Sequence, residues 1–185
     1  MSETSNEHKE RAPKHVRFAL LTISTSRYYK KMKGEPLQDV SADLAAGILK
    51  TSGHEVTVRE VVSDDANMIG ESLRQLISDS RVDVVVSMGG TGITSTDVTI
   101  ETVAPLLEKE LNGFGEAFRR LSYDQIGTSA ILTRCTAGLI RRKEVFCLPG
   151  SPQAVETALK ELIVPEVGHI LAHAQQQMTS NTETV

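Results

Sequence analysis

The stretch VDVVVSMGGTGITSTD, residues 82–97, decides the fold class of this chain. Residues 82–88 form an almost unbroken apolar run, which is typical of a central parallel strand that is covered on both faces. A glycine-rich loop follows at 89–92, and then comes Asp97. Glycine-rich loops after strands often hold phosphate groups, but the lysine of a P-loop is absent from this one. The stretch therefore predicts an α/β domain with a loop suited to anions.

The segments on both sides of this stretch alternate between strand and helix patterns. Apolar, β-rich segments predict strands at 16–24, 54–62, 82–88 and 144–149. Apolar residues at helical spacing predict helices at 39–53, 65–78, 108–121 and 151–163. This order favours parallel strands with helices on both faces of the sheet. The expected fold class is α/β, a three-layer sandwich of the Rossmann-like kind with a mostly parallel central sheet.

Each predicted strand is followed by a short polar or glycine-rich turn. These turns are TSR at 25–27, SDD at 63–65, GGTG at 89–92 and PGSPQ at 149–153. Ligands of open α/β sheets bind at the carboxyl ends of the strands, so all four turns are expected at one binding edge.

The chemistry of these turns suits a phosphate ligand and a cation. Gly89, Gly90 and Gly92 allow the backbone to approach a ligand closely, and Thr91 adds a hydroxyl group. Two acidic side chains, Asp64 and Asp97, would hold Mg²⁺ against a triphosphate, because magnesium takes one or two carboxylates plus substrate phosphates.

The same residues also have purely structural interpretations. Asp64 or Asp65 could cap the helix that follows, and Asp97 could cap the next helix. The glycines could serve only a tight turn. Ser151 and Pro152 form a favourable N-cap and first-turn pair whatever else they do. The coincidence of four such turns on one predicted edge favours a functional site.

Length and composition exclude several classes of protein. The chain has 185 residues, which suits a single domain, expected at 15–175 between disordered tails at 1–14 and 176–185. A net charge of −4 argues against general nucleic-acid binding. No apolar run reaches membrane-spanning length and no secretory signal is present, so a cytoplasmic protein is expected. Basic clusters at 27–33 and 140–143 are either solvated surface or local phosphate attractors.

Three longer segments carry a family resemblance. MGGTGITSTDVTIETV, FRRLSYDQIGTSAILTR and LPGSPQAVETALKELI resemble the MoaB/MogA family of molybdenum cofactor biosynthesis proteins, most closely its MoaB branch. The resemblance extends from Val16 to His173. It implies an adenylyltransferase that moves AMP from Mg·ATP to the molybdopterin phosphate and releases pyrophosphate. It also implies a homotrimer or hexamer, and a MoeA-like partner that inserts molybdenum or tungsten.

The resemblance also assigns roles to individual residues. Asp64 and Asp97 match the two important acidic residues of the family, which are the expected catalytic and metal-binding pair. The remaining matches are expected to bind the nucleotide or the pterin phosphate, and they are Gly89, Gly90, Thr91, Gly92, Ser122, Thr133, Gly150, Ser151 and Pro152.

One departure from the family pattern concerns charge. Ser95 and Thr96 replace the Pro-Arg of some relatives, so Arg134 or the 27–33 cluster would have to supply the phosphate-binding cation. Two other functions remain open from the sequence: a molybdopterin carrier without catalysis, and a CinA-like domain that acts on nucleotides.

Overall fold

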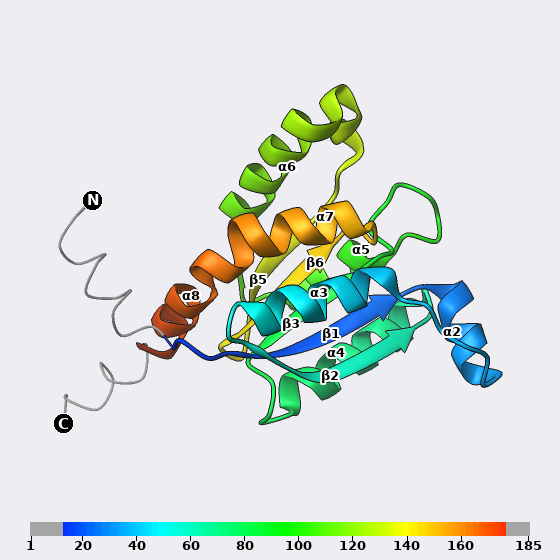
Figure 1. Cartoon of the computed structure of the whole chain (residues 1–185), viewed down its shortest axis with the longest axis horizontal. Coiled ribbons are helices and arrows are strands. Elements are labelled where there is room, and N and C mark those ends of the chain that lie inside the picture. Colours follow the sequence, from blue (N-terminus) through cyan, green and yellow to red (C-terminus); the bar gives the residue numbers. More distant parts are fainter. Residues whose placement is uncertain (1–12, 177–185) are drawn as a thin grey trace.

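A computed structural model describes residues 13–176 and contains one six-stranded sheet in the order β2-β1-β3-β6-β5-β4 (Figure 1). The strands are β1 (Arg17–Ile23), β2 (Glu55–Val62), β3 (Val84–Met88), β4 (Lys109–Glu110), β5 (Thr136–Ile140) and β6 (Lys143–Leu148). Pairing is parallel among β2, β1, β3 and β6, whereas β5 is antiparallel to both β6 and β4. The predicted mostly parallel sheet is confirmed. The expected tails lie almost wholly outside the described residues.

Helices cover both faces of the sheet. The α-helices are α2 (Thr25–Met32), α3 (Val40–Thr51), α4 (Ala66–Ser78), α5 (Thr99–Val103), α6 (Asn112–Ile126), α7 (Pro152–Thr157) and α8 (Val164–Gln176). Shorter 3-10 segments are η1 (Ala104–Leu106) and η2 (Gly127–Leu132), and η3 (Ala158–Ile163) is a π-helix. In Figure 1, α3, α7 and α8 lie in front of the sheet and α4 lies behind it. The expected three-layer architecture is therefore present.

The alternation of side chains along β3 and β6 creates two separate cores. Val84, Val86 and Phe146 face a core shared with α3, α7, η3 and α8. Val85 and Cys147 face the opposite core, which α4 and α5 close. The central strands are buried on both faces, which explains why β3 reads as a continuous apolar run.

Several elements differ from the sequence prediction. The hairpin of β5 and β6 was not predicted, because its two-residue turn is Arg141-Arg142 rather than a glycine-containing pair. Both arginines adopt positive φ, 46° and 67°. The basic cluster at 140–143 is therefore a hairpin turn. The segment predicted as helix 108–121 begins instead with β4, and α6 starts at Asn112.

The helix predicted at 151–163 is the first part of a longer one. It continues through η3 and α8 to Gln176. Pro165 lies near the start of α8, and proline has no N–H to donate to the preceding turn. A π-helical turn just before such a residue accommodates this loss without ending the helix.

The carboxyl ends of the four parallel strands meet at one edge, as predicted. The N–H of Ser24 donates to the carbonyl of Val62 at 2.9 Å, and the N–H of Gly89 donates to the carbonyl of Leu148 at 3.0 Å. These bonds join the turns after β1 and β2, and after β3 and β6. The edge thus contains two hydrogen-bonded pairs of neighbouring turns.

Alanine at Gly89 is expected to destabilise the fold by at least about 2 kcal/mol, because Gly89 has φ of +110° and an added Cβ would lie 2.3 Å from the Ile23 carbonyl oxygen. Gly47 is the matched control, since its Cβ would meet nothing within 4 Å. Alanine at Gly47 should stabilise α3 by about 0.5–1 kcal/mol. Urea unfolding measures the change in the free energy of unfolding for both variants. Equal changes would contradict the close packing of Gly89 against the Ile23 carbonyl.

Candidate active site

Asp64 is held at the edge of the site by the first residue of α2. The backbone N–H and the hydroxyl of Thr25 both donate to Asp64 Oδ2, at 2.7 and 2.8 Å. In return the N–H of Asp64 donates to Thr25 Oγ1 at 3.1 Å. The capping alternative applies to the next residue instead, because Asp65 accepts from the Met68 N–H and is the N-cap of α4. Asp64 is therefore not a helix cap.

Asp97 is held in the same manner inside its own loop. The backbone N–H and the hydroxyl of Thr94 donate to Asp97 Oδ2 at 2.9 and 2.5 Å. The Thr94 hydroxyl is the main reason that the pKa of Asp97 lies below its ordinary value, and the charge of Arg134 adds to the effect. The alternative interpretation, in which Asp97 caps the next helix, does not hold, since the N-cap of α5 is Val98. The carboxylate stabilises the loop instead.

The glycine loop lies directly against both carboxylates. A Cβ added at Gly90 would lie 3.0 Å from Asp64 Oδ1 and 2.4 Å from Thr99 Oγ1. A Cβ added at Gly92 would lie 2.7 Å from the Asp97 carboxylate. The absence of side chains at Gly90 and Gly92 lets the two aspartates approach one loop, so both members of the acidic pair that the sequence singled out lie against the same loop.

The loop also has internal constraints. The hydroxyl of Thr99 donates to the Gly89 carbonyl at 2.8 Å, and its N–H donates to the Gly90 carbonyl at 2.9 Å. The Gly89 N–H is already bonded to β6, so it is not free for a phosphate. The Thr91 side chain is buried, with Thr91 only 4 % exposed. The Gly92 backbone already forms a hydrogen bond with Asp97, which lowers the pKa of that carboxyl group. The backbone N–H groups of Gly90 and Thr91 are therefore the remaining candidates for binding an anion in this loop.

The turn after β6 closes one side of this arrangement. A Cβ at Gly150 would lie 3.2 Å from the Gly89 Cα, and the Gly150 carbonyl accepts from the Ser41 hydroxyl at 2.7 Å. Ser151 is the N-cap of α7, where it accepts from the Ala154 N–H, and Pro152 is the first helical residue. The predicted cap is confirmed, and the start of α7 lies beside the glycine loop.

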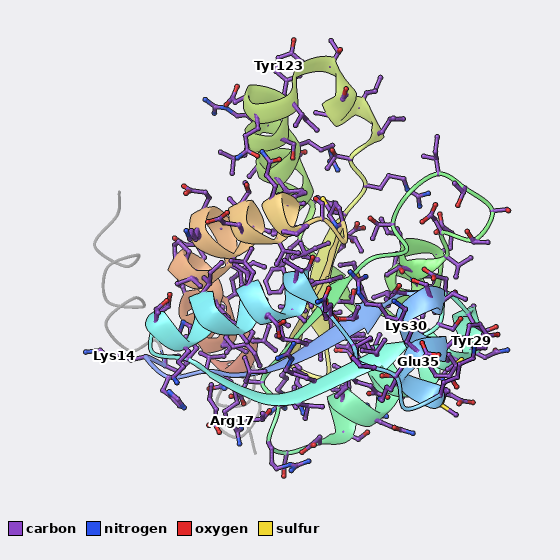
Figure 2. All side chains as sticks on the ribbon, turned by 45° about the vertical axis from the view of Figure 1, so that its right-hand side comes forward. Lys14, Arg17, Tyr29, Lys30, Glu35 and Tyr123 are labelled. Atoms are coloured by element: carbon purple, nitrogen blue, oxygen red, sulfur yellow. The ribbon has the colours of Figure 1, made fainter. Side chains whose placement is uncertain are left out.

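Arg134 supplies a positive charge to the loop. Its Nη1 donates to the Gly92 carbonyl at 2.9 Å, and its Nη2 pairs with Glu101. The second basic candidate, the 27–33 cluster, lies on and just after α2. Arg27 and Lys30 line a cavity of about 430 Å³ together with Ser26. Ser26 directly follows Thr25, the residue that donates to Asp64. Figure 2 shows Lys30 at the α2 end of the molecule.

For two predicted site residues, Ser122 and Thr133, the structure gives no hydrogen bond to the aspartates or to the glycine loop, all of which it describes. Ser122 is buried in α6, and its hydroxyl donates to the Phe118 carbonyl at 2.8 Å, within its own helix. Thr133 follows η2 and precedes Arg134. Their expected roles at a pterin phosphate remain predictions.

Sequence reasoning missed the residues that hold the carboxylates. Thr25 is the first residue of α2 and Thr94 lies in the loop after β3, and no spacing pattern marks either threonine. Thr99 is completely buried and fixes two carbonyls of the glycine loop. The roles of these three threonines can be recognised only in the folded structure, where the segments that follow the strands lie next to one another.

The fold and this edge define the class of protein: an α/β domain whose ligand site combines a glycine loop with two carboxylates. The chain matches the family model described as "Probable molybdopterin binding domain" over residues 19–169, and it belongs to that family.

Close relatives cover almost the whole chain. It is 46% identical to "Molybdenum cofactor biosynthesis protein B" of Bacillus cereus over 172 residues, 92% of this chain and 98% of the relative. It is also 46% identical to "Molybdopterin adenylyltransferase" of Pyrococcus furiosus over 174 residues, again 92% and 98%.

The fold is similar to that of solved structures with related names. A crystal structure of Molybdenum cofactor biosynthesis protein B has a TM-score of 0.82 at 46% identity, covering 90% of this chain and 100% of the other. The tungsten cofactor synthesizing protein MoaB from Pyrococcus furiosus has a TM-score of 0.77 at 45% identity, with 88% and 99% covered. CinA from Thermoplasma acidophilum is only 23% identical, with a TM-score of 0.55 and 85% and 99% covered, and so shares the fold alone.

Proposed function

We propose that this protein is a molybdopterin adenylyltransferase in molybdenum or tungsten cofactor biosynthesis, which uses ATP and Mg²⁺. The observation that carries the proposal is the pair of aspartates on one glycine loop, each held by a threonine. The name of the Pyrococcus furiosus relative supports the reaction. The alternative of a CinA-like function is not favoured, because the likeness to CinA extends only to the fold.

The donor set fits magnesium. No group of three or more His, Cys, Asp or Glu side chains in residues 13–176 is arranged to hold a metal ion. Two carboxylates without further protein ligands suit Mg²⁺, which keeps waters and takes substrate phosphates. Asp64 and Asp97 would hold the ion, which would neutralise charge on the triphosphate when bound.

The remaining residues of the edge would position the substrates. The N–H groups of Gly90 and Thr91 would bind phosphate oxygens, and the N-terminus of α7 at Ser151 and Pro152 would favour a further anion. The attacking group is the phosphate of molybdopterin, which is already an anion, so no general base is required. Catalysis then comes from alignment and charge neutralisation.

Arg134 is expected to act as the phosphate-binding cation in place of the Pro-Arg of some relatives. Glutamine at Arg134 should raise the KM for ATP about tenfold, because a charge-assisted contact to the triphosphate is lost. Arg81 is the matched control, since it pairs with Asp79 in the turn that precedes β3. Initial-rate measurements on both variants test this, and an unchanged KM in the Arg134 variant would remove Arg134 from the site.

The alternative function is a molybdopterin carrier without catalysis. The relative in Bacillus cereus is named for cofactor biosynthesis, without a transfer reaction. Incubation of the purified protein with molybdopterin, ATP and Mg²⁺ separates the two functions. Pyrophosphate release supports the enzyme, whereas pterin binding without pyrophosphate supports the carrier.

The proposed enzyme acts as a homotrimer or hexamer in the cytoplasm and passes its product to a MoeA-like metal-insertion protein. An apolar tip on α6 and η2 supports self-association, with exposed Tyr123, Ile126, Ile131 and Leu132. Figure 1 shows α6 extending away from the sheet, and Figure 2 shows Tyr123 at its end. Among the described residues, every helix is too short or too polar to cross a lipid bilayer.

A further inference from the structure

Each carboxylate of the site accepts two hydrogen bonds from one threonine, and at Asp97 a backbone hydrogen bond from Gly92 adds to them. Thr25 donates both its N–H and its hydroxyl to Asp64 Oδ2, and Thr94 donates the same two groups to Asp97 Oδ2. The two threonines come from different segments, the first turn of α2 and the loop after β3. The same two-bond pattern thus occurs twice, once on each acidic residue of the site.

Both carboxylates lie against the glycine loop. Asp64 Oδ1 lies 3.0 Å from the position that a Cβ on Gly90 would occupy. The corresponding position at Gly92 lies 2.7 Å from the threonine-bonded Oδ2 of Asp97 and 3.2 Å from its Oδ1. Two donors on a single oxygen fix the rotation of a carboxylate, because both bonds would break if the group turned. The threonine bonds therefore fix the orientation of each carboxylate relative to the loop.

We propose that Thr25 and Thr94 are positioning residues that fix the orientation of the two aspartate carboxylates toward the divalent cation. This inference rests on the proposed function for the presence of a cation at this site. Because both threonine bonds fall on one oxygen, the other oxygen of each carboxylate accepts no bond from the threonine, so each aspartate can coordinate through one oxygen and leave room for phosphate and water ligands. Hydrogen bonds to metal ligands typically change metal affinity 10–100-fold.

The test uses Mn²⁺ alone, titrated into the full chain and followed by loss of the free-ion EPR signal. Valine at Thr25 or Thr94 removes the hydroxyl bond to the carboxylate and preserves the side-chain volume. At Thr25 it also removes the acceptor of the Asp64 N–H. Each of T25V and T94V should weaken Mn²⁺ binding about tenfold, whereas T25S and T94S should restore it. T51V is the matched control, because the Thr51 hydroxyl bonds only to carbonyls within α3.

A second measurement separates positioning from general damage. In pyrophosphate release, T25V and T94V should lose activity that higher Mg²⁺ concentrations recover in part, and the serine variants should need no extra Mg²⁺. Melting curves identify any variant that does not fold. If the variants at one threonine fail to fold, the variants at the other threonine provide the test of the positioning role.

The outcomes distinguish this inference from the proposed function. Mn²⁺ affinity that falls in the valine variants while the wild-type protein makes no pyrophosphate would refute the transferase and support the positioning role. An active wild-type protein whose valine variants bind Mn²⁺ as tightly as T51V would overturn the positioning role. Wild-type protein that binds no Mn²⁺ would also overturn it.

Discussion

Asparagine at Asp64 or at Asp97 is expected to lower the rate of adenylyl transfer by at least about a hundredfold. Either change removes one of the two negative charges that would hold the cation, and it keeps the shape of the side chain. The amide oxygen can still accept from Thr25 or Thr94, so the turn should remain folded. Steady-state pyrophosphate release measures the loss, and molybdopterin binding should be nearly unchanged.

Asp65 provides the matched control for this pair, because it stands next to Asp64 and caps α4. Asparagine is an equally good N-cap, so D65N should retain both stability and turnover. Near-normal turnover in D64N and D97N would refute the roles assigned to both aspartates. A comparable loss in D65N would show that any charge change at this edge is harmful.

Glutamine at Glu144 is expected to stabilise the protein by about 3 kcal/mol at pH 7. Glu144 is completely buried at the start of β6, and neither carboxyl oxygen has a hydrogen-bond partner within the described part of the chain. Burial raises the pKa of Glu144 to about 9 from its ordinary value of 4.5. The folded protein therefore holds a proton that the unfolded chain releases at neutral pH.

The sign of the pH dependence follows from this proton. The contribution of protonated Glu144 to the free energy of unfolding is fully present below pH 4.5 and is lost as the pH rises toward 9. The advantage of E144Q over the wild-type protein should thus be absent at pH 4 and grow by about 1.4 kcal/mol per pH unit above 4.5. Urea unfolding across this range measures it, with exposed Glu116 as the control for a Glu-to-Gln change. A pH-independent difference would contradict a neutral Glu144.

The layers of the fold could be predicted because burial leaves a strong pattern. The central strand β3 lies between two helical layers, so nearly all its side chains are apolar. Ile69 and Leu73 recur at helical spacing because only one side of α4 contacts the sheet. Where burial is weaker, the pattern fails, as in β5, a short strand near the sheet edge that contains Gly138. That glycine is needed because the Lys109 carbonyl would lie 2.3 Å from its Cβ.

The site could be predicted only in part. Parallel strands place their following turns at one edge, so the topology alone brings Asp64, Gly90 and Asp97 together. Which of Asp64 and Asp65 is the cap depends on local backbone geometry, which the sequence does not specify. The bonds from Thr25 to Asp64 join residues 39 positions apart, so no local pattern could reveal them.

The most direct test follows both products of one reaction. Purified protein is incubated with Mg²⁺, molybdopterin and ATP labelled at the α-phosphate, and pyrophosphate is measured in the same samples. We predict equal amounts of labelled pterin and pyrophosphate, both dependent on molybdopterin and both lost in D64N and D97N. Label that never reaches the pterin, in a protein that binds molybdopterin normally, would contradict adenylyl transfer at this site.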